Sequence, residues 1–260
     1  MTLTTGADVE TFVKKGRNIV SSVGLIGGSK EQPLLVDKGN LQEDNVLAEF
    51  AINPASSEDE FVHNIQTVMG KLQDKLVQDN YTYAIKSSHL MSAKFLDCPQ
   101  ALQFGCERDF DAWEGFPNSA PNPKDVGALR TAGGHIHLGG YYYHSSFAMA
   151  MNIAKWMDLL LAVPSVLLDN DKQRRKVYGK AGAFRKKEYG LEYRTLSNFW
   201  ISSEERMRWA YKQSLEAVHR AQEAPLEDMI DQDLIVGCIN NSDKRVAKTL
   251  VNQYNIAVPA

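Results

Sequence analysis

The sequence predicts an α+β fold in which an antiparallel sheet has helices packed on one face. Several short segments alternate apolar and polar residues with the period of two that is typical of strands, and longer segments with helical spacing lie between them. Strands separated by such long helical excursions suit an antiparallel sheet that helices cover on one side. The chain has no internal repeats and no linker rich enough to divide it, so we expect a single domain over residues 1–260.

The composition is that of an ordinary globular protein, with 43% hydrophobic and 23% charged residues. A net charge of −3 gives no sequence-wide basic field that would favour nucleic acid or an anionic membrane as a partner. The three cysteines, at positions 98, 106 and 238, form no CxxC pair, which suits a reducing compartment. Polar residues and a proline interrupt the most apolar segment, 147–168, and residues 1–10 lack the features of a signal peptide. We therefore expect a cytoplasmic protein.

Residues 129–140, with the sequence LRTAGGHIHLGG, are the most informative stretch of the chain. His135 and His137 lie two positions apart, so on a strand both imidazoles face the same side of the sheet. Glycine pairs on either side leave room for a ligand or for neighbouring backbone. Neutral imidazole is a common metal ligand, and the Arg130 guanidinium can bind phosphate or carboxylate. The stretch predicts a site for a metal–phosphate ligand; the alternative is a glycine-rich turn before a strand with surface histidines.

Acidic residues occur in two strand candidates nearer the N-terminus. Asp8 and Glu10 share one face of a strand over residues 6–13, where such acids either face solvent or serve as oxygen ligands for Mg²⁺. Glu49 lies inside a strongly apolar strand over residues 46–52, where a carboxylate is costly unless it is paired or bound to a cation.

A dense cluster of positive charge follows the most apolar segment, with seven basic residues in the fourteen positions 174–187. Glycines between them predict a mobile loop. A dense basic loop in an acidic protein predicts local anion binding, with polyphosphate as the natural ligand, and the alternative is a loop that is only solvated. The basic residues are Arg174, Arg175, Lys176, Lys180, Arg185, Lys186 and Lys187.

Residues 190–200 show strand-like alternation that puts Glu192 and Arg194 on one face. The two side chains either pair with each other at a surface or, beside a metal–phosphate site, bind different parts of the ligand. In the second case Glu192 binds the metal and Arg194 binds the phosphate or the substrate carboxylate. The long polar and aromatic connection over residues 104–122 is the best candidate for substrate contact, with a passive surface loop as the alternative.

Helices are expected between these strand candidates. Ser57 opens a capping box and a helix that continues to about residue 76. Pro164 ends or kinks an apolar helix over about residues 147–163. Further helices are expected over about residues 203–223 and 242–252.

The acids Glu10 and Glu49, the histidine pair and Glu192 belong to four separate strand candidates. If the polar faces of these strands line one concave surface, they form a carboxylate and histidine cage for divalent cations. Carboxylate oxygens with histidine suit Mg²⁺ or Mn²⁺ better than Zn²⁺, because no cysteine is placed to join them. Arg130 and the basic segment would then hold a nucleoside triphosphate over the cations.

Six motifs occur in order along the first 200 residues: GADVE (6–10), GGSKE (27–31), QEDNVLAEF (42–50), FGC (104–106), RTAGGHIH (130–137) and the segment 174–200. With these motifs the chain resembles the phage amidoligase family, carboxylate–amine ligases of the glutamine synthetase and glutamate–cysteine ligase superfamily. The resemblance implies a glutamine synthetase-like catalytic sheet and an ATP-dependent ligation. In that reaction ATP phosphorylates a substrate carboxylate, and an amine attacks the acyl phosphate to give an amide.

The resemblance also implies cofactors, substrates and residue roles. ATP and Mg²⁺ are the implied cofactors, with Mn²⁺ as a substitute, and the substrates are small-molecule or peptide carboxylates and amines. The implied metal ligands are Glu10, Glu49, His135, His137 and Glu192, with Asp8 and Glu43 as further candidates. The implied catalytic residues are Arg130, Arg185, Arg194 and Glu192, and the implied ATP-binding residues are Lys180, Arg174, Arg175, Arg185 and Arg130. A homo-oligomer is compatible with the superfamily, and the compartment is the cytoplasm of an infected bacterial host if a phage encodes the chain.

Two other functions fit parts of the sequence. A metal-dependent hydrolase would use the same histidine and glutamate cage to activate water, but it would not need the basic, glycine-containing segment. A non-catalytic virion or scaffold protein would keep the fold without the activity, whereas here the acids and arginines of the motifs are present. The sequence therefore favours the ligase.

Overall fold

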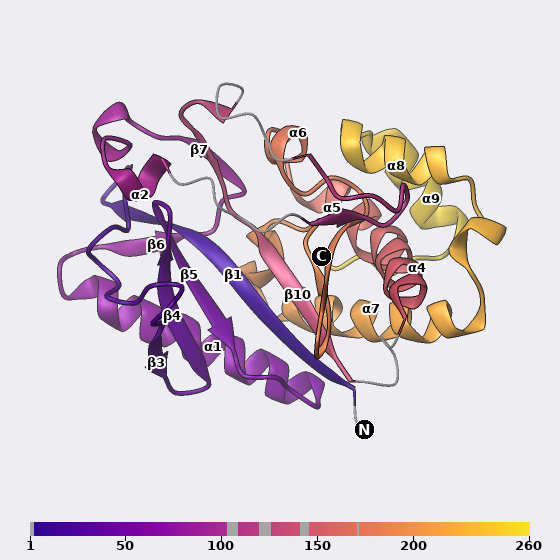
Figure 1. Ribbon diagram of the computed structural model, residues 1–260, viewed down its shortest axis with the longest axis horizontal. Coiled ribbons are helices and arrows are strands. Elements are labelled where there is room, and N and C mark those ends of the chain that lie inside the picture. The colour runs from indigo at the N-terminus through magenta and orange to yellow at the C-terminus, as the bar shows by residue number, and fades with distance from the viewer. Residues whose placement is uncertain (1–2, 103–108, 120–125, 141–145, 171) are drawn as a thin grey trace.

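The computed structural model describes residues 3–102, 109–119, 126–140, 146–170 and 172–260. Within these residues ten strands form one sheet in the order β3-β4-β5-β1-β10-β12-β11-β8, with β2 and β6 both paired to β1 (Figure 1). The paired strands run antiparallel, which confirms the predicted α+β class. The strands are β1 (Thr4–Lys15), β2 (Asn18–Val20), β3 (Leu34–Val36), β4 (Gly39–Asp44), β5 (Leu47–Ile52), β6 (Thr82–Ala84), β8 (Phe110–Asp111), β10 (Gly134–Gly139), β11 (Ala183–Lys187) and β12 (Gly190–Tyr193). A separate pair joins β7 (Ser88–Leu90) to β9 (Leu129–Thr131).

The predicted helices are present and begin at side-chain caps. Ser57, Ser146 and Ser203 each accept a hydrogen bond from the third backbone N–H after them, which caps α1, α4 and α7. The α-helices are α1 (Glu58–Val77), α2 (Pro99–Leu102), α4 (Phe147–Met157), α5 (Val163–Leu168), α6 (Arg174–Val177), α7 (Glu204–Glu223), α8 (Gln232–Asn241) and α9 (Lys244–Gln253). The sequence analysis did not predict α8, and α9 begins two residues later than expected because Asp243 is its cap.

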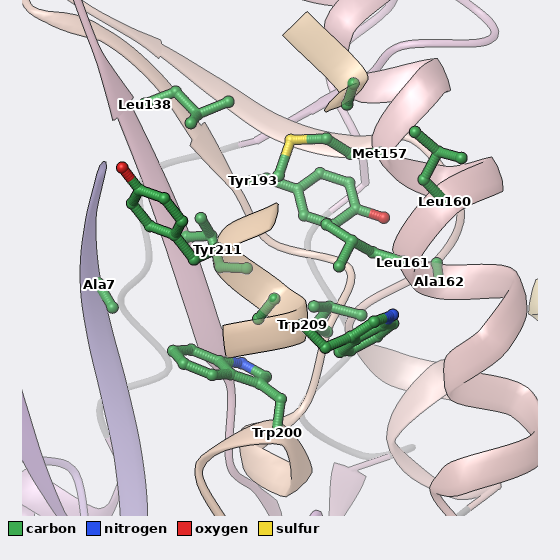
Figure 2. Close-up of a cluster of buried hydrophobic side chains, with 14 of the residues drawn as sticks. Ala7, Leu138, Met157, Leu160, Leu161, Ala162, Tyr193, Trp200, Trp209 and Tyr211 are labelled. Atoms are coloured by element: carbon green, nitrogen blue, oxygen red, sulfur yellow. The ribbon is translucent and has the colours of Figure 1, made fainter. Parts of the chain in front are cut away.

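Alternation along the central strands gives the sheet one apolar and one polar face. The buried residues Ala7, Val9, Ile136 and Leu138 of β1 and β10 belong to one core together with side chains of α1, α4 and α7. Figure 2 shows part of this core, in which aromatic side chains lie between the strands and the helices. Each large apolar side chain that is fully buried stabilises the fold by roughly 1.5–3 kcal/mol. The residues that alternate with this set face the opposite side of the sheet and form the polar face.

The basic segment 174–187 is not the mobile loop that its glycines predict. Its two ends form α6 and β11, and Arg174, Arg175 and Arg185 are buried. Arg174 donates to two backbone carbonyls and Arg175 to two serine hydroxyls. These hydrogen bonds replace the ones that the guanidinium groups would make with water. A count of charges does not reveal such acceptors, because they come from other parts of the chain.

The strand expected over residues 190–200 is shorter than predicted. β12 ends at Tyr193, where its pairing with β10 and β11 ends, and a 3₁₀ helix follows at Asn198–Ser202. Beyond Tyr193 isolated backbone hydrogen bonds to the neighbouring strands replace the regular ladder, from the Arg194 N–H to the Ala183 carbonyl at 2.8 Å and from the Gly134 N–H to the Leu196 carbonyl at 3.1 Å. The strand therefore ends although the alternation of the sequence continues.

The apolar stretch 147–168 forms α4, a π-helical turn at Asp158–Ala162, and α5. It is long and apolar enough to cross a membrane, but 78% of its most apolar window is buried inside the protein, as in a core helix. Pro164 does not end the helix, because it lies in the first turn of α5 after the π turn.

Asp158, in this π turn, is fully buried and accepts four hydrogen bonds. Its Oδ2 lies 2.7 Å from Trp113 Nε1 and 2.6 Å from the Gly182 nitrogen. Its Oδ1 lies 2.6 Å from the Tyr193 hydroxyl and 3.3 Å from that of Thr195. Burial raises the pKa of Asp158 to about 7, although the donors oppose the rise. The carboxylate thus ties the helices to the end of β12 and to the start of β11.

Asp158→Asn is expected to keep the fold and to change its pH dependence. The new amide can donate to the two hydroxyls, which rotate to accept, while its carbonyl keeps the two N–H donors. Because the native pKa lies above the ordinary value, the wild type loses stability as the pH rises from about 4 through about 7, and the variant does not titrate there. Urea unfolding should show that the free energy of unfolding of the variant, relative to that of the wild type, is higher at about pH 8 than at about pH 5. Equal pH dependence would mean that Asp158 stays ionised throughout this range.

Candidate functional site

The register of the central strands brings predicted acids, histidines and arginines together on the polar face. Residues directly opposite each other on paired strands have Cβ atoms roughly 4.5–5.5 Å apart, so they are neighbours. The opposed pairs are Glu10 with Glu49, Asp8 with His135, and His137 with Glu192, and the outer strands β4 and β11 add Gln42 and Arg185. β1, at the centre of Figure 1, runs between β5 and β10 and so lies at the middle of this set.

The part of the polar face formed by β4, β5 and β1 carries concentrated negative charge. Burial raises the pKa of Glu10 to about 7, and Asp44 adds to the rise, although the Gly133 N–H, 2.5 Å from Glu10 Oε2, opposes it. Burial also raises the pKa of Glu49 well above its ordinary value, with further repulsion from Asp8, Asp44 and Glu10. A cation beside these carboxylates would remove the repulsion that raises both pKa values. We call these residues, Asp8, Glu10, Asp44 and Glu49, the acidic group.

The part formed by β12 and β11 carries concentrated positive charge. Glu192 forms an ion pair with Arg194, Lys187 Nζ lies 3.1 Å from the same carboxylate, and Arg185 Nη1 lies 3.4 Å from it. Burial opposes ionisation of Glu192, but Arg194 and the nearby histidines lower its pKa to about 2. Three cations around one carboxylate suit an anionic ligand. We call Arg185, Lys187 and Arg194 the basic group.

The two histidines of β10 lie between the acidic and basic groups. His135 Nδ1 is 2.8 Å from Asp8 Oδ1 and 3.2 Å from Arg194 Nη1. His137 Nε2 is buried and 3.2 Å from Asp8 Oδ2, yet it has no hydrogen-bond partner among the described residues. One ligand atom from each of Asp8, His137 and Glu192 lies within 4.8 Å of the others, so these atoms can converge on a divalent cation.

Gly133 and Gly134 are required by the packing at the start of β10. The His135 ring occupies the space beside Gly133, where an added Cβ would lie 2.3 Å from His135 Nε2. An added Cβ on Gly134 would lie 2.6 Å from Trp200 Nε1, which donates to the Gly134 carbonyl at 3.0 Å. Side chains of the protein itself, and not a ligand, therefore occupy the space beside these two glycines.

A cavity of about 80 Å³ opens beside the acidic group. Arg174 lines it and donates to the carbonyls of residues 194 and 195 at 3.0 and 2.7 Å, while its buried Nε has no hydrogen-bond partner among the described residues. Arg130 also lines it, but its guanidinium donates to three backbone carbonyls and to Asn45 at 2.8–3.1 Å. These bonds give Arg130 a structural role in place of the free phosphate contact expected from the sequence. The other charged lining residues are Glu10, Asp44, Asp109, His135 and Arg194.

Three residues expected to bind ligands lie elsewhere. Arg175, next to Arg174 on α6, donates instead to Ser165 and Ser242 among the helices. Lys180 is exposed and lines neither this cavity nor a second cavity that is lined by Asp8 and His137. Glu43 lies on the other face of β4 and accepts from the backbone N–H groups of Ile26 and Gly27 at 3.1 and 3.3 Å. Neighbouring residues point in different directions, and the sequence does not show which of them faces the site.

The structure adds site residues to which the sequence analysis gave no individual role. Lys187 follows Arg185 at period two, a signal that is visible once the segment is known to be a strand. Tyr189 lies in the turn before β12, and no pattern marks it. Asp109, 3.4 Å from Arg194 Nε, belongs to the connection over residues 104–122 that was expected to contact substrate. Residues 104–108 and 120–122 of that connection lie outside the described residues.

Residues 129–252 match the model of the family described as phage phiEco32-like COOH.NH2 ligase-type 2. The resemblance to phage carboxylate–amine ligases is confirmed. The segment matched to this ligase family contains the histidine pair and the basic group, whereas the whole acidic group precedes it in the chain. No curated protein matches the sequence.

Two solved structures resemble the chain at low identity. A novel glutamine synthase homolog aligns with a TM-score of 0.41 and 13% identity, over 98% of this chain and 66% of its own. A bifunctional glutathione synthetase from Pasteurella multocida aligns with a TM-score of 0.42 and 10% identity, over 98% of this chain and 47% of its own. These scores are too low to assign the fold, so the glutamine synthetase-like sheet stays a prediction.

When divalent cations are absent, the stability of Glu49→Gln relative to the wild type is expected to rise with pH above the ordinary pKa of a glutamate. The variant removes one of the repelling carboxylates, and its amide oxygen can still accept from Gln42, whose Nε2 lies 2.7 Å from Glu49 Oε2. Because folding raises the pKa of Glu49, the wild type loses stability as the pH rises through that pKa, and the variant does not. Urea unfolding in a chelator at about pH 6 and about pH 9 measures the difference.

The control is Glu223→Gln, which removes an exposed carboxylate of α7 and should leave the free energy of unfolding nearly unchanged at both pH values. A Glu49→Gln protein that is less stable than the wild type at both pH values would show that the carboxylates do not repel each other.

Proposed function

We propose that this protein is an ATP-dependent carboxylate–amine ligase that forms an amide or peptide-like bond through an acyl phosphate, with Mg²⁺ or Mn²⁺. The observation that carries the proposal is the division of charge on one sheet face, with carboxylates on one side, cations on the other and histidines between. Phosphoryl transfer uses both kinds of group, because metal ions neutralise the phosphates and fixed donors stabilise the developing charge. The family match over residues 129–252 supports the same chemistry.

The residues of the acidic group fit a divalent cation. Asp8 and His137 offer ligand atoms that converge with one of Glu192, and His137 Nε2 is a buried nitrogen with no hydrogen bond in the described structure. Glu10 and Glu49, opposite each other on β1 and β5, add further hard carboxylate oxygens. Such a donor set suits Mg²⁺ or Mn²⁺. When bound, the cation supplies neutralisation of phosphate charge and Lewis-acid polarisation.

The basic group and Arg174 would hold the phosphate groups. Their guanidinium groups are buried, so little water competes with a phosphate for their donors. Arg174 lines the first cavity, and its buried Nε has no hydrogen-bond partner among the described residues. Phosphorylation gives the substrate carboxylate a leaving group that a free carboxylate lacks, so no side chain has to act as a nucleophile.

A second cavity, of about 250 Å³, lies at the other end of the polar face and suits the amine. Asp8 and His137 line it together with small or apolar residues of β1, β5 and β10 and with Tyr189, and its described lining includes no lysine or arginine. The first cavity is lined by both carboxylates and arginines, so it offers Arg174 and Arg194 to anionic substrate groups beside acids that suit a cation. The Asp8 carboxylate supplies the negative charge that lines this cavity and attracts an amine.

The other two functions leave parts of the site unexplained. A hydrolase would bind its metal through Asp8, His137 and Glu192, but its reaction would not require the cations of the basic group. A purely structural role would give no reason to bury mutually repelling carboxylates, which lower stability.

Thermal melting with Lys187→Met and Lys186→Met tests the proposal with two adjacent lysines. Lys187 contacts Glu192 on the polar face, whereas Lys186 is exposed and pairs in register with Leu191 of the apolar face. A ligand at a hundredfold its dissociation constant adds roughly 2.7 kcal/mol to stability. We expect Mg²⁺ with a non-hydrolysable ATP analogue to raise the melting temperature of the wild type and of Lys186→Met, and to raise that of Lys187→Met clearly less.

The same experiment separates the alternatives. Stabilisation by Mg²⁺ alone, with no further effect of the analogue, would favour the hydrolase. The absence of any shift would favour a structural role. Equal shifts in the two lysine variants would show that the basic group does not hold the phosphates.

A further inference from the structure

Tyr189 is tied to His137 by two contacts. The two rings stack, with centroids 5.9 Å apart and an interplanar angle of 15°. The Tyr189 hydroxyl lies 2.5 Å from His137 Nδ1. The backbone holds the tyrosine in this place, because the Tyr189 carbonyl accepts from the Gly140 N–H at 3.0 Å and so fastens the β11–β12 turn to the end of β10.

The other nitrogen of the same ring faces the acidic group. His137 Nε2 is buried and 3.2 Å from Asp8 Oδ2, and it has no hydrogen bond among the described residues. An imidazole nitrogen can bind a cation only through its lone pair, so the ring proton must then be on Nδ1. The group that faces Nδ1 decides whether this tautomer is stable, and that group is the Tyr189 hydroxyl.

We propose that Tyr189 is a positioning residue for the cation site: its oxygen accepts the His137 Nδ1 proton and so keeps Nε2 free to bind a divalent cation beside Asp8. This inference rests on the cation site of the proposed function and adds to it a residue that contacts neither the cation nor the phosphates. Metal-bound histidines commonly donate their second N–H to such a partner, and loss of the partner weakens metal affinity by roughly 10- to 100-fold.

The surroundings of Tyr189 fit this role. Burial and the Glu192 and Asp8 carboxylates raise the pKa of its hydroxyl, so the oxygen stays protonated and neutral. Tyr189 is nevertheless 48% exposed, so packing in the hydrophobic core does not explain its position. Its ring also lines the 250 Å³ cavity, so an occupant of that cavity would contact the residue that orients His137.

Tyr189→Phe tests the proposal, because it keeps the stacked ring and removes only the oxygen. We would measure the Mn²⁺ dissociation constant of the full chain by electron paramagnetic resonance of free Mn²⁺. Tyr189→Phe should bind Mn²⁺ roughly 10- to 100-fold more weakly than the wild type, without a change in the melting temperature of the metal-free protein. The control is Tyr254→Phe, which removes a surface hydrogen bond to Gln253 and should bind Mn²⁺ as the wild type does.

Imidazole ¹⁵N NMR provides a readout that a merely structural role would not change. In the Mg²⁺-loaded wild type the His137 proton should be on Nδ1, and in Tyr189→Phe this tautomer should lose population. Wild-type affinity in Tyr189→Phe, or a proton on Nε2 in the loaded wild type, would overturn the inference while leaving the cation site intact. Failure of the wild type to bind Mn²⁺, or binding that Asp8→Asn does not weaken, would instead overturn the cation site of the proposed function and the inference with it.

Discussion

The burial of several carboxylates on adjacent strands is the constraint on which the rest of the structure depends. A buried charge without a partner costs several kcal/mol, and the acids of β1 and β5 also repel one another. The same strands offset this cost on their other face, where a continuous apolar core lies under the helices. The order of the strands places the cations of β11 beyond the histidines, where they pair with Glu192. Glu49 is left facing the carboxylates of Asp8, Asp44 and Glu10. Sheet stability and site charge both follow from one alternating pattern.

That alternation is also why much of the site could be predicted from the sequence. A period of two decides that Asp8 and Glu10 share a face, and likewise Glu192 and Arg194, with no knowledge of the neighbouring strands. The strands meet because each has one apolar face that needs to be covered. Register is different, because it depends on contacts between residues far apart in the chain. The sequence therefore contained the acids and histidines of the site, but not the fact that Glu10 lies opposite Glu49.

The remaining residues could not be predicted, because their roles depend on partners distant in the sequence. Arg174 and Arg175 are identical in type and adjacent, yet one lies at the cavity and the other among the helices. Arg130 is in the most informative motif, and its guanidinium is held by carbonyls that no pattern reveals. Tyr189 occupies a turn, where neither a helical nor a strand period applies. Charge and chemistry can be predicted from local sequence, whereas the direction of a side chain requires the tertiary structure.

A net charge of −3 says little about the electric field that a ligand would meet in this protein. Opposite charges separated across β10 form a dipole in the plane of the sheet, and most of the groups that create it are buried. Dissolved ions screen exposed charges over about 8 Å at physiological ionic strength, but they cannot enter the space between buried ones. Surface attraction between a protein and its ligand fades as salt is added. The attraction within this site should instead be nearly independent of ionic strength, because its field lies inside the fold.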